Sequence, residues 1–416
     1  MSKSNITGSV TAPSSKSYTI RALVCAALAR GESEIISPLG SDDTAACRDV
    51  LSNLGVTVTE KKDSWLVTGG NLKPPERDLY CHESAATQRF MTAVCAVVRG
   101  RCRLTAAASL AKRPIGPLLP ALRQLGIACQ INEADSSVTV YGGSLKGGTV
   151  ELPGNISSQY VSALLFISPF ADGGMTIRLT TSLESWPYVL MTLDCLNAFG
   201  IEIEHSEDLR EFKTARQYYK PARYHIEGDW SSASYLLAAG AIAGKVTVRN
   251  LNPESLQADK KLLDFLKEMG AALDINGDTI TVRKSSLKAV RADLTDCIDL
   301  LPTMAVLAAS AEGTSELTGI ERARIKESNR VSSVKAGLEK TGIGVTEEQD
   351  RLRITGGPAH GAVIDSNNDH RIAMAFSLLG ITTGDTVIEN AECVSKTYPE
   401  FWDILGSIGG EVKTNG

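Results

Sequence analysis

The amino-acid sequence predicts an α/β protein built from six copies of one structural unit, and two observations support this prediction. The same order of segments recurs along the chain: an apolar, alanine-rich helix, a β-branched strand, and a second, amphipathic helix that ends before a glycine. The spacing is also regular. By subtraction, the glycines that end the second helices lie 71, 74, 70, 72 and 67 residues apart: Gly55, Gly126, Gly200, Gly270, Gly342 and Gly409.

A glycine directly after a helix commonly takes the left-handed conformation that terminates it, because glycine lacks the β-carbon that penalises this conformation. A short β-type stretch follows each of these six glycines. The stretches are VTVTE, IACQI, IEIE, AALDI, IGVT and EVKT. Helix, glycine and strand in this order predict six βαβαββ-like modules.

Length and composition limit the class of protein. A chain of 416 residues exceeds one ordinary hydrophobic core, so two or three domains are expected. With 43% hydrophobic and 22% charged residues and no long uncharged apolar run, the composition is typical of a soluble, globular protein. The start lacks a secretory signal, which favours a cytoplasmic location. A net charge of −5 gives no general attraction for nucleic acid or anionic membranes.

The cysteines argue against a disulfide scaffold and against a zinc site. There are nine of them, with no CxxC pair and no histidine at a matching spacing. Reduced thiols are therefore expected. Four of them lie among apolar residues and are predicted to be core side chains: Cys47, Cys95, Cys195 and Cys297.

Polar and ionisable residues gather where the first helix of each unit begins. These starts are SSKSYTIR (14–21), HESAATQR (82–89), GNISSQY (154–160), EGDWSSASY (227–235), TDCIDLLP (295–302) and SNNDHR (366–371). Helix N-termini carry free amide groups and a partial positive charge. Helices that run together would therefore attract a phosphorylated or carboxylated ligand.

Two interpretations of these starts are open. Several polar residues can serve simply as helix N-caps, which is their commonest role. They are Ser84, Asn155, Asp229 and Ser231. Capping does not explain the cations, because lysine and arginine near a helix N-terminus oppose its dipole. The cations, which indicate a bound anion, are Lys16, Arg21, Arg89, Arg113 and Arg371.

Nine stretches of the sequence match the motifs of a known family. They are SSKSYTIRAL, KRPIGPL, ISSQYVSALL, ESWPY, EGDWSSASY, CIDLLPT, RIKESNR, NNDHRIAMAFS and CVSKTYPEF. By these motifs, in this order and over its whole length, the chain resembles the 5-enolpyruvylshikimate-3-phosphate (EPSP) synthases. NDHR before an apolar helix, together with SKT before the last helix, is the specific part of the match, whereas one motif alone would be weak.

The resemblance implies a two-domain inside-out α/β barrel with three repeats in each domain. The expected N-terminal domain covers residues 13–227, and the expected C-terminal domain covers residues 1–12 and 228–416. Two crossing strands would hinge the domains, and the active site would lie in the cleft between them. By the same analogy, the protein is expected to be a monomer.

The resemblance also implies a reaction. The family transfers the enolpyruvyl (carboxyvinyl) group of phosphoenolpyruvate to the 5-hydroxyl of shikimate 3-phosphate, on the route to chorismate and the aromatic amino acids. The transfer is an addition and elimination through a tetrahedral intermediate, with no metal and no cofactor. The expected partners are therefore these two small molecules, with no nucleic acid and no membrane.

Family motif positions assign residues to each substrate. For shikimate 3-phosphate they are Lys16, Ser17, Arg21, Ser157, Ser158, Gln159, Ser185, Tyr188, Asp299 and Lys326. For phosphoenolpyruvate they are Lys16, Ala85, Arg89, Arg113, Gln159, Arg330, Arg371 and Lys396. A trianionic substrate that binds beside a second phosphate needs several cations, which these residues would supply. The alternative for each arginine taken alone is a surface salt bridge, which is its usual role.

The expected catalytic residues are Lys16, Asp299, Glu327 and Lys396. Asp299 would orient the 5-hydroxyl and accept its proton, and Glu327 would exchange the proton at C3 of phosphoenolpyruvate. The two lysines would stabilise phosphate and carboxylate charge as the adduct forms.

Some neighbouring residues have simpler interpretations. Without the resemblance, Asp299 could be a helix N-cap ahead of Pro302, and Glu327 could be a solvated helix residue. His370 and Asp369 are expected to hold the NDHR turn rather than to carry protons.

The sequence departs from the family pattern at two places. Ser14 replaces a usual glycine. In ESAATQR, Ala85 and Ala86 stand where the family has glycine and threonine, and Phe90 replaces a common proline. An added methyl at Ala85 would project into the phosphoenolpyruvate pocket. Because family members with alanine at that position are associated with tolerance of glyphosate, this chain is expected to be tolerant.

Rival functions stay open. A UDP-N-acetylglucosamine enolpyruvyl transferase would share the architecture. That family shows a reactive cysteine in a glycine-rich loop and an asparagine beside its N-terminal lysine, where this chain has Ser17. A catalytically retired anion-binding relative or a six-repeat scaffold would not need the carboxylates of Asp299 and Glu327. A nucleotide-binding enzyme is disfavoured because the chain has no GxxxxGK loop and no GxGxxG after a strand.

Overall fold

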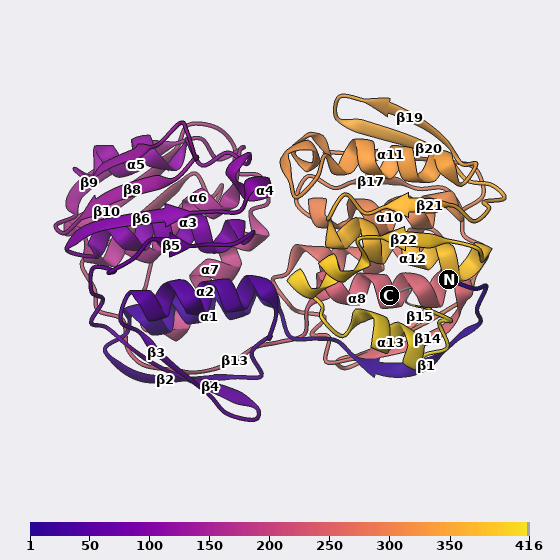
Figure 1. Cartoon of the computed structure of the whole chain (residues 1–416), viewed down its shortest axis with the longest axis horizontal. Helices are drawn as coiled ribbons and strands as arrows, with labels where there is room; N and C mark the ends of the chain where they lie inside the picture. The colour runs from indigo at the N-terminus through magenta and orange to yellow at the C-terminus, as the bar shows by residue number, and fades with distance from the viewer. Residues whose placement is uncertain (414–416) are drawn as a thin grey trace. The chain divides into compact units, whose positions relative to one another are not determined.

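A computed structural model describes residues 1–413 of the chain (Figure 1). Contacts divide the chain into two compact units. Ser14–Ile226 forms the first, called the N-terminal domain below, and Met1–Pro13 with the chain from Glu227 onward forms the C-terminal domain. The expected ranges, 13–227 and 1–12 with 228–416, differ from these by one residue at each boundary. Within residues 1–413, no helix is long and apolar enough to cross a membrane.

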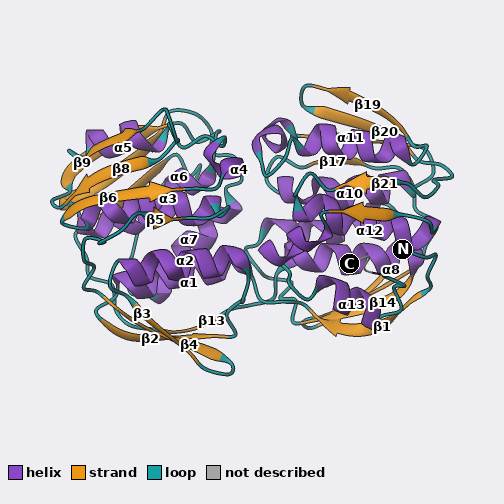
Figure 2. Ribbon diagram, viewed as in Figure 1, coloured by secondary structure: helices purple, strands orange, loops and turns teal. Residues whose placement is uncertain are grey.

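The N-terminal domain has inner helices and outer sheets (Figure 2). Its helices are α1 (Lys16–Leu28), α2 (Asp42–Asn53), α3 (Ala85–Val94), α4 (Ala108–Ala111), α5 (Leu118–Gln124), α6 (Ser158–Ile167) and α7 (Pro187–Ala198). Its strands are β2 (Gly31–Ile36), β3 (Thr57–Glu60), β4 (Ser64–Gly69), β5 (Leu79–Tyr80), β6 (Gly100–Thr105), β7 (Ala128–Ile131), β8 (Val138–Gly142), β9 (Lys146–Leu152), β10 (Asp172–Leu179), β11 (Glu204–His205), β12 (Glu211–Thr214) and β13 (Arg223–His225). Nearly every residue of α1, α3 and α6 is buried, so these helices form the centre of the core.

The C-terminal domain repeats this plan around the buried helices α8, α10 and α12. Its helices are α8 (Trp230–Ala243), α9 (Leu262–Glu268), α10 (Leu301–Ala309), α11 (Arg330–Lys340), α12 (His370–Thr383) and α13 (Phe401–Ser407). Its strands are β1 (Ile6–Thr11), β14 (Gly244–Arg249), β15 (Ala272–Asn276), β16 (Thr279–Arg283), β17 (Arg291–Asp293), β18 (Thr314–Thr318), β19 (Gly344–Glu348), β20 (Arg351–Thr355), β21 (Val363–Asp365) and β22 (Val387–Glu389). Short 3-10 helices include η3 (Ala258–Lys261), η4 (Ile298–Leu300), η5 (Glu321–Ile325) and η6 (Ala391–Lys396).

The sheets follow one strand order. In the N-terminal domain the orders are β13-β2-β4-β3, β5-β6-β8-β7 and β11-β12-β10-β9. In the C-terminal domain they are β1-β14-β16-β15 and β17-β18-β20-β19, with β21 and β22 as a separate pair. Each sheet contains one parallel pair, and each four-stranded sheet adds two antiparallel strands. This is the predicted βαβαββ order.

The chain begins in the C-terminal domain and returns to it. Strand β1 pairs in parallel with β14, and β13 pairs in parallel with β2. The first strand of the chain therefore completes a sheet of the C-terminal domain, while β13, far along the sequence, completes the first sheet of the N-terminal domain.

The last predicted strand is wrong. EVKT was expected to be a strand, but residues 411–413 form none, and residue 414 lies outside the described residues. The sixth module keeps only the parallel pair of β21 and β22. Val412 packs against the hydrophobic core of the domain instead. Strand propensity alone does not form a strand where no neighbouring strand is available to pair with it.

The six glycines that define the repeat all have the expected left-handed backbone. Their φ angles are 88°, 81°, 78°, 81°, 85° and 102°, in chain order. A residue with a β-carbon pays a steric penalty in this conformation. The repeat seen in the sequence is therefore a repeat of helix terminations.

Substitution of one such glycine should destabilise the protein without any steric clash. At Gly270, φ is +81° and an added β-carbon would meet nothing within 4 Å, so Gly270→Ala should lower the free energy of unfolding by about 1–2 kcal/mol through backbone strain. Gly406→Ala is the matched control, since Gly406 lies inside α13 with equally open space and no left-handed backbone. The control should be neutral or stabilising by up to about 1 kcal/mol in urea unfolding. Equal effects of the two changes would contradict this account.

Candidate active site

Lys16 begins α1 and is paired with an acidic residue that the sequence did not indicate. Its Nζ lies 3.1 Å from Oδ2 of Asp43, whose side chain is 5% exposed. Asp43 belongs to the first turn of α2, and acidic residues are common there for reasons of helix dipole alone. For that reason the segment SDDTAAC (41–47) does not by itself indicate a functional role for Asp43. The ion pair restrains Lys16 at the start of its helix.

Arg21 is buried and links α1 to α7. Its Nε donates to Oγ1 of Thr192 (2.9 Å), its Nη1 to the carbonyl of Ser17 (2.9 Å) and its Nη2 to the carbonyl of Tyr188 (3.0 Å). Burial lowers the pKa of Arg21. Three donors are thus used within the protein, and two of them fix the backbone of Ser17 and Tyr188, which are both predicted to bind shikimate 3-phosphate.

Arg89 joins α3 to the KRPIG segment and to the start of α6. From α3, its Nη1 donates to Oε1 of Gln159 (2.7 Å), and its Nη2 donates to the carbonyl of Pro114 (2.9 Å) in the KRPIG segment. A longer contact of 3.3 Å reaches Oγ of Ser157. Arg89 therefore holds the side chain of Gln159 and the KRPIG loop at the N-terminus of α6. These partners are far apart in sequence, so no local pattern could have indicated them.

Arg113 lies on the turn after α4 and is partly buried. Burial raises the pKa of Tyr160, while the cations of Arg89 and Arg113 act in the opposite direction. The guanidinium of Arg89 lies over the ring of Tyr160, 5.2 Å from its centroid. The hydroxyl of Tyr160 also donates to the carbonyl of Pro114, so two donors hold the KRPIG loop at this one carbonyl.

Three of the four serines predicted to bind shikimate 3-phosphate lie at the starts of α6 and α7, and the fourth, Ser17, lies in the first turn of α1. Ser157 is the N-cap of α6, with its Oγ accepting from the backbone N–H of Gln159 (3.3 Å), and Ser158 is the first residue of that helix. Ser185 precedes α7, is buried, and has a left-handed φ of 53°. This conformation is uncommon for a residue other than glycine, asparagine or aspartate, and such residues occur often at functional sites.

Two of the four expected N-caps are confirmed. Ser84 caps α3 and Asp229 caps α8, each by accepting from a backbone N–H. Asn155 does not cap α6, because Ser157 takes that position, and its side chain contacts Thr181 instead. Ser231 is not a cap either, since it lies within the first turn of α8.

Ala85 is the first residue of α3, and its side chain is buried. Ala86 follows it and is also buried. Phe90 lies one turn further along the same helix, where its ring packs edge-on against Phe166 with 5.1 Å between the centroids. The departures at these positions therefore alter the buried face of α3 and its first turn.

In the C-terminal domain, three carboxylates surround the buried guanidinium of Arg330. Its Nη1 donates to Oδ1 of Asp299 (2.7 Å), its Nη2 to Oε2 of Glu327 (2.5 Å), and its Nε to Oδ2 of Asp369 (2.8 Å). The side chain of Arg330 is 1% exposed. Burial alone would lower the pKa of Arg330, but the three carboxylates raise it. The two predicted catalytic carboxylates are thus brought to one arginine.

Asp299 is the meeting point of three predicted cations. Besides Arg330, its carboxylate contacts Arg371 (3.1 Å) and Lys326 (3.4 Å). Burial alone would raise the pKa of Asp299, yet these three cations hold it well below its usual value. The carboxylate is therefore ionised at neutral pH. The alternative role as an N-cap is wrong, because Asp299 lies within η4 and its carboxylate is bound to cations.

Asp369 holds the start of α12, whereas no hydrogen bond among the described residues gives the ring of His370 the holding role expected of it. Asp369 caps the helix by accepting from the backbone N–H of Arg371 (3.0 Å), and it also binds Arg330. His370 is 1% exposed, and neither ring nitrogen has a hydrogen-bond partner among the described residues. Burial, followed by the nearby Arg371, holds the pKa of His370 well below its usual value. Lys396, in η6, is 6% exposed and belongs to the same charged surroundings.

All nine cysteines have free thiols, and the four expected in the core are buried. Within the described residues, no group of histidine, cysteine, aspartate and glutamate side chains could hold a metal ion.

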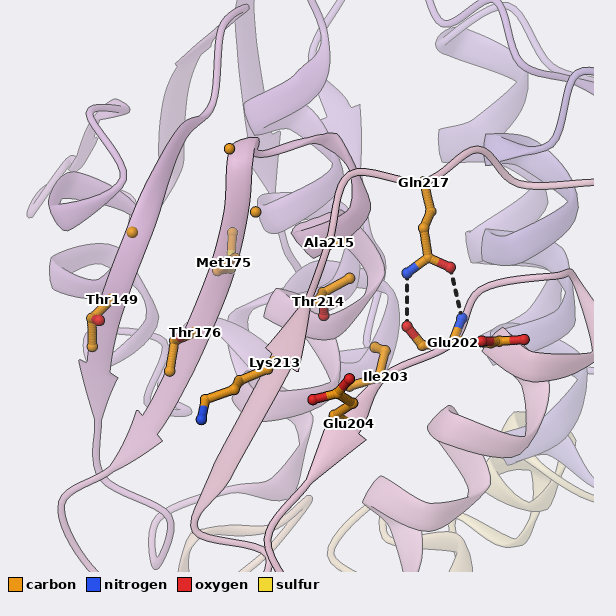
Figure 3. A pocket seen from close by; sticks show the side chains of 13 residues that line it. Thr149, Met175, Thr176, Glu202, Ile203, Glu204, Lys213, Thr214, Ala215 and Gln217 are labelled. Carbon is orange, nitrogen blue, oxygen red and sulfur yellow. Dashed lines mark hydrogen bonds between the residues drawn. The ribbon is translucent and has the colours of Figure 1, made fainter.

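A groove of about 700 Å³ follows one outer sheet of the N-terminal domain. Thr149, Thr176 and Lys213 project from its strands, and Gln217 bonds the backbone of Glu202 at its edge (Figure 3). None of the predicted site residues, all of which the structure describes, lines this groove. It is the solvent-facing surface of a sheet and is separate from the candidate site.

Solved structures with the same fold are enolpyruvyl transferases. An EPSP synthase of Acinetobacter baumannii has a TM-score of 0.83 at 26% identity, with 100% of this chain and 98% of that chain covered. The enolpyruvyl transferase NikO of Streptomyces tendae has a TM-score of 0.79 at 18% identity, covering 97% of this chain and 95% of that chain, which shows the fold alone. The expected two-domain inside-out α/β barrel is confirmed, and it places the chain in this class of proteins.

The family follows from the sequence comparisons. The family model for EPSP synthase (3-phosphoshikimate 1-carboxyvinyltransferase) matches residues 1–405. A 3-phosphoshikimate 1-carboxyvinyltransferase of Dehalococcoides mccartyi is 52% identical over 407 residues, which are 97% of this chain and 96% of that protein. The chain belongs to the EPSP synthase family, as its motifs predicted.

The Arg330 cluster gives a prediction for stability and its pH dependence. Arg330→Met would leave three buried carboxylates without their shared cation, so the free energy of unfolding should fall by about 3–5 kcal/mol at pH 7. Because the pKa of Asp299 is depressed in the folded protein, its stabilising contribution is present above the unfolded value of about 3.9 and lost as the pH falls. In Arg330→Met the buried carboxylates lack the cation that keeps them ionised, so they take up protons more readily as the pH falls, and the deficit should shrink towards pH 4.

Urea unfolding between pH 4 and 8 checks this prediction. Arg291→Met is the control, because Arg291 is 76% exposed and forms a surface ion pair with Glu316 at 3.6 Å. The free energy of unfolding of Arg291→Met should differ from that of the wild type by less than about 1 kcal/mol at every pH. A deficit for Arg330→Met that is equally small, or independent of pH, would refute the role of the cluster.

Proposed function

We propose that this chain is an enolpyruvyl transferase of the shikimate pathway, acting on phosphoenolpyruvate and shikimate 3-phosphate as its family does. Membership of the EPSP synthase family supports the activity, and it supports a place in aromatic amino acid biosynthesis. One structural observation supports the roles proposed for individual residues. The two carboxylates needed for proton transfer, Asp299 and Glu327, are held by one buried arginine and border further cations.

In the proposed mechanism, Glu327 takes up a proton when the anionic substrates bind, and it gives that proton to C3 of phosphoenolpyruvate while the 5-hydroxyl oxygen attacks C2. The hydroxyl loses its proton as the new C–O bond forms, which gives a tetrahedral phospho-adduct. Glu327 then takes a proton back from C3, and the C–O bond to phosphate breaks. Asp299, which receives the hydroxyl proton, passes it to the departing phosphate, and Glu327 ends protonated as it began, so the enzyme returns to its starting state.

Asp299 acts first as an orienting group in this scheme. A carboxylate whose pKa is depressed by three cations is a weak base, although it accepts a hydrogen bond from a hydroxyl well. Anionic substrates at Arg330, Arg371 and Lys326 would offset those cations and so increase the basicity of Asp299. Substrate binding would therefore prepare it to accept the 5-hydroxyl proton.

Lys16, Arg113 and Lys396 supply the positive charge that the phosphate and carboxylate groups require, together with Arg330 and Arg371. Arg21 and Arg89 have a different part in the proposal, because each already makes three hydrogen bonds within the protein.

Arg21 and Arg89 instead hold other predicted substrate-binding residues: Ser17, Tyr188, Ser157 and Gln159. Because the predicted residues come from both domains, the activity requires the whole chain.

We also propose that the protein works as a monomer in the cytoplasm. Nine free thiols, eight of them buried, support a reducing compartment.

The activity is tested by release of inorganic phosphate from phosphoenolpyruvate, with shikimate 3-phosphate or UDP-N-acetylglucosamine as the acceptor. Release should depend on shikimate 3-phosphate. Glu327→Gln and Asp299→Asn should each lower kcat by about 100- to 10,000-fold, the usual cost of losing a general acid or base. Asp274→Asn, on the exposed strand β15, is the matched control and should leave kcat unchanged. Release with UDP-N-acetylglucosamine, or with neither acceptor, would refute the assignment.

The methyl group of Ala85 is the proposed cause of glyphosate tolerance, since it lies at the first position of α3, within a predicted phosphoenolpyruvate-binding segment. The wild-type enzyme should need far more than micromolar glyphosate for half inhibition, and Ala85→Gly should lower that concentration about tenfold or more, equal to about 1.4 kcal/mol. Ala86→Gly introduces a glycine one residue later and controls for a weakened helix. Low-micromolar inhibition of the wild type, or equal effects of both changes, would contradict the proposal.

A further inference from the structure

Tyr160 is a buried residue that the family motifs assign to neither substrate. It is the third residue of α6 and is 0% exposed. Its hydroxyl donates to the carbonyl of Pro114, which lies 46 residues earlier in the KRPIG segment. A tyrosine hydroxyl taken out of water normally requires such a partner, because an unpaired buried polar group is costly. The bond therefore connects the start of α6 to the segment that carries Arg113.

The KRPIG loop, residues 112–116, has few contacts of its own that could fix its shape. It joins α4 to α5, and Pro114 within it has no backbone N–H to donate. The backbone N–H of Arg113 donates to the carbonyl of Leu110 (2.9 Å), and Ile115 is 6% exposed and belongs to the core. The carbonyl of Pro114 lies between these two attachments, and it ties the loop to α3 and α6.

The two donors to this carbonyl differ in stiffness. One is Nη2 of Arg89 (2.9 Å), whose long side chain has several rotatable bonds. The other is the hydroxyl of Tyr160, which is carried on a rigid ring with two rotatable bonds. The guanidinium of Arg89 also lies 5.2 Å from the centroid of that ring, a favourable cation–π distance. Tyr160 is therefore the stiff donor, and its ring restrains the flexible one.

These contacts form a closed ring of four residues. Nη1 of Arg89 donates to Oε1 of Gln159 (2.7 Å), and Gln159 directly precedes Tyr160 in α6. Arg89 and Tyr160 then meet again at the carbonyl of Pro114. A closed network restricts each member more than a single bond does. The position of Pro114, and with it the backbone next to Arg113, therefore depends on the hydroxyl of Tyr160.

We propose that Tyr160 is a positioning residue for phosphoenolpyruvate, because its hydroxyl holds the KRPIG loop in the conformation that presents Arg113 to this substrate. The inference rests on the proposed function, in which Arg113 supplies positive charge to phosphoenolpyruvate. Without the hydroxyl, the loop has to be ordered as the substrate binds, and that ordering weakens binding. Turnover should suffer less, since Arg113 has no part in the proton transfers.

The test measures KM and kcat for Tyr160→Phe, which keeps the ring under Arg89 and removes only the hydroxyl. The carbonyl of Pro114 retains its bond from Arg89, so no buried acceptor is left unpaired and the variant should fold. The KM for phosphoenolpyruvate should rise about three- to tenfold, the cost of ordering one mobile side chain on binding. The KM for shikimate 3-phosphate and kcat should each change less than about twofold.

Tyr219→Phe is the matched control. Tyr219 is 4% exposed, and its hydroxyl donates to the carbonyl of Phe166, further along the same helix α6 (2.6 Å). The change removes the same atom from a buried tyrosine of the same domain, but it leaves the bond between Tyr160 and Pro114 in place. Tyr219→Phe should therefore lower the stability to a similar extent while the KM for phosphoenolpyruvate stays at the wild-type value.

Arg113→Met, alone and combined with Tyr160→Phe, tests whether Tyr160 acts through the arginine. If it does, Tyr160→Phe should raise the KM for phosphoenolpyruvate little or not at all in the Arg113→Met protein. The inference is overturned by an unchanged KM in Tyr160→Phe, by an equal rise for both substrates or in Tyr219→Phe, or by an undiminished rise without Arg113. Each of these results leaves the activity in place. Absence of phosphate release by the wild type would instead contradict the proposed function, and the inference with it.

Discussion

The chemistry of the C-terminal domain depends on one buried guanidinium. Arg330 is 1% exposed and binds Asp299, Glu327 and Asp369 at 2.5–2.8 Å. Removing four charges from water is expensive, and the arrangement is favourable only because each carboxylate is hydrogen-bonded in good geometry. The same bonds set the positions of the two proposed proton-transfer groups. Arg330 is the first residue of α11 and Asp369 is the N-cap of α12, so the bond between them also joins these two helices. The geometry of the site and the packing of the helices therefore depend on each other.

The repeat explains why such a cluster can exist in a stable fold. Each central helix is apolar along its length and polar at its first turn, so burial of the body stabilises the domain while the first turn remains available for chemistry. Helix N-termini also provide positive potential for the caps Ser157, Asp229 and Asp369. A cluster of cations and carboxylates at these ends is therefore supported by the backbone as well as by side chains.

The repeat period, the six helix-ending glycines and the polar helix starts could all be predicted, because each depends on residues close together in the sequence. The partners of Arg89 and the pairing of Lys16 with Asp43 could not, since they join segments 25 to 70 residues apart. The wrong strand at residues 411–413 has a related cause, because strand pairing depends on a neighbour that local propensity does not show.

The arginines of the N-terminal domain show how this design differs from a simple positive surface. Arg21 and Arg89 direct their donors to backbone carbonyls and polar side chains, and both are at most 5% exposed. Their positive charge still acts on any anion nearby, because buried charges are poorly screened, while their contacts stop them from moving towards it. Preorganised charge of this kind avoids reorganisation during the reaction, which is the property that electrostatic catalysis requires. Arginines held in place in this way are therefore what a site for two anionic substrates needs.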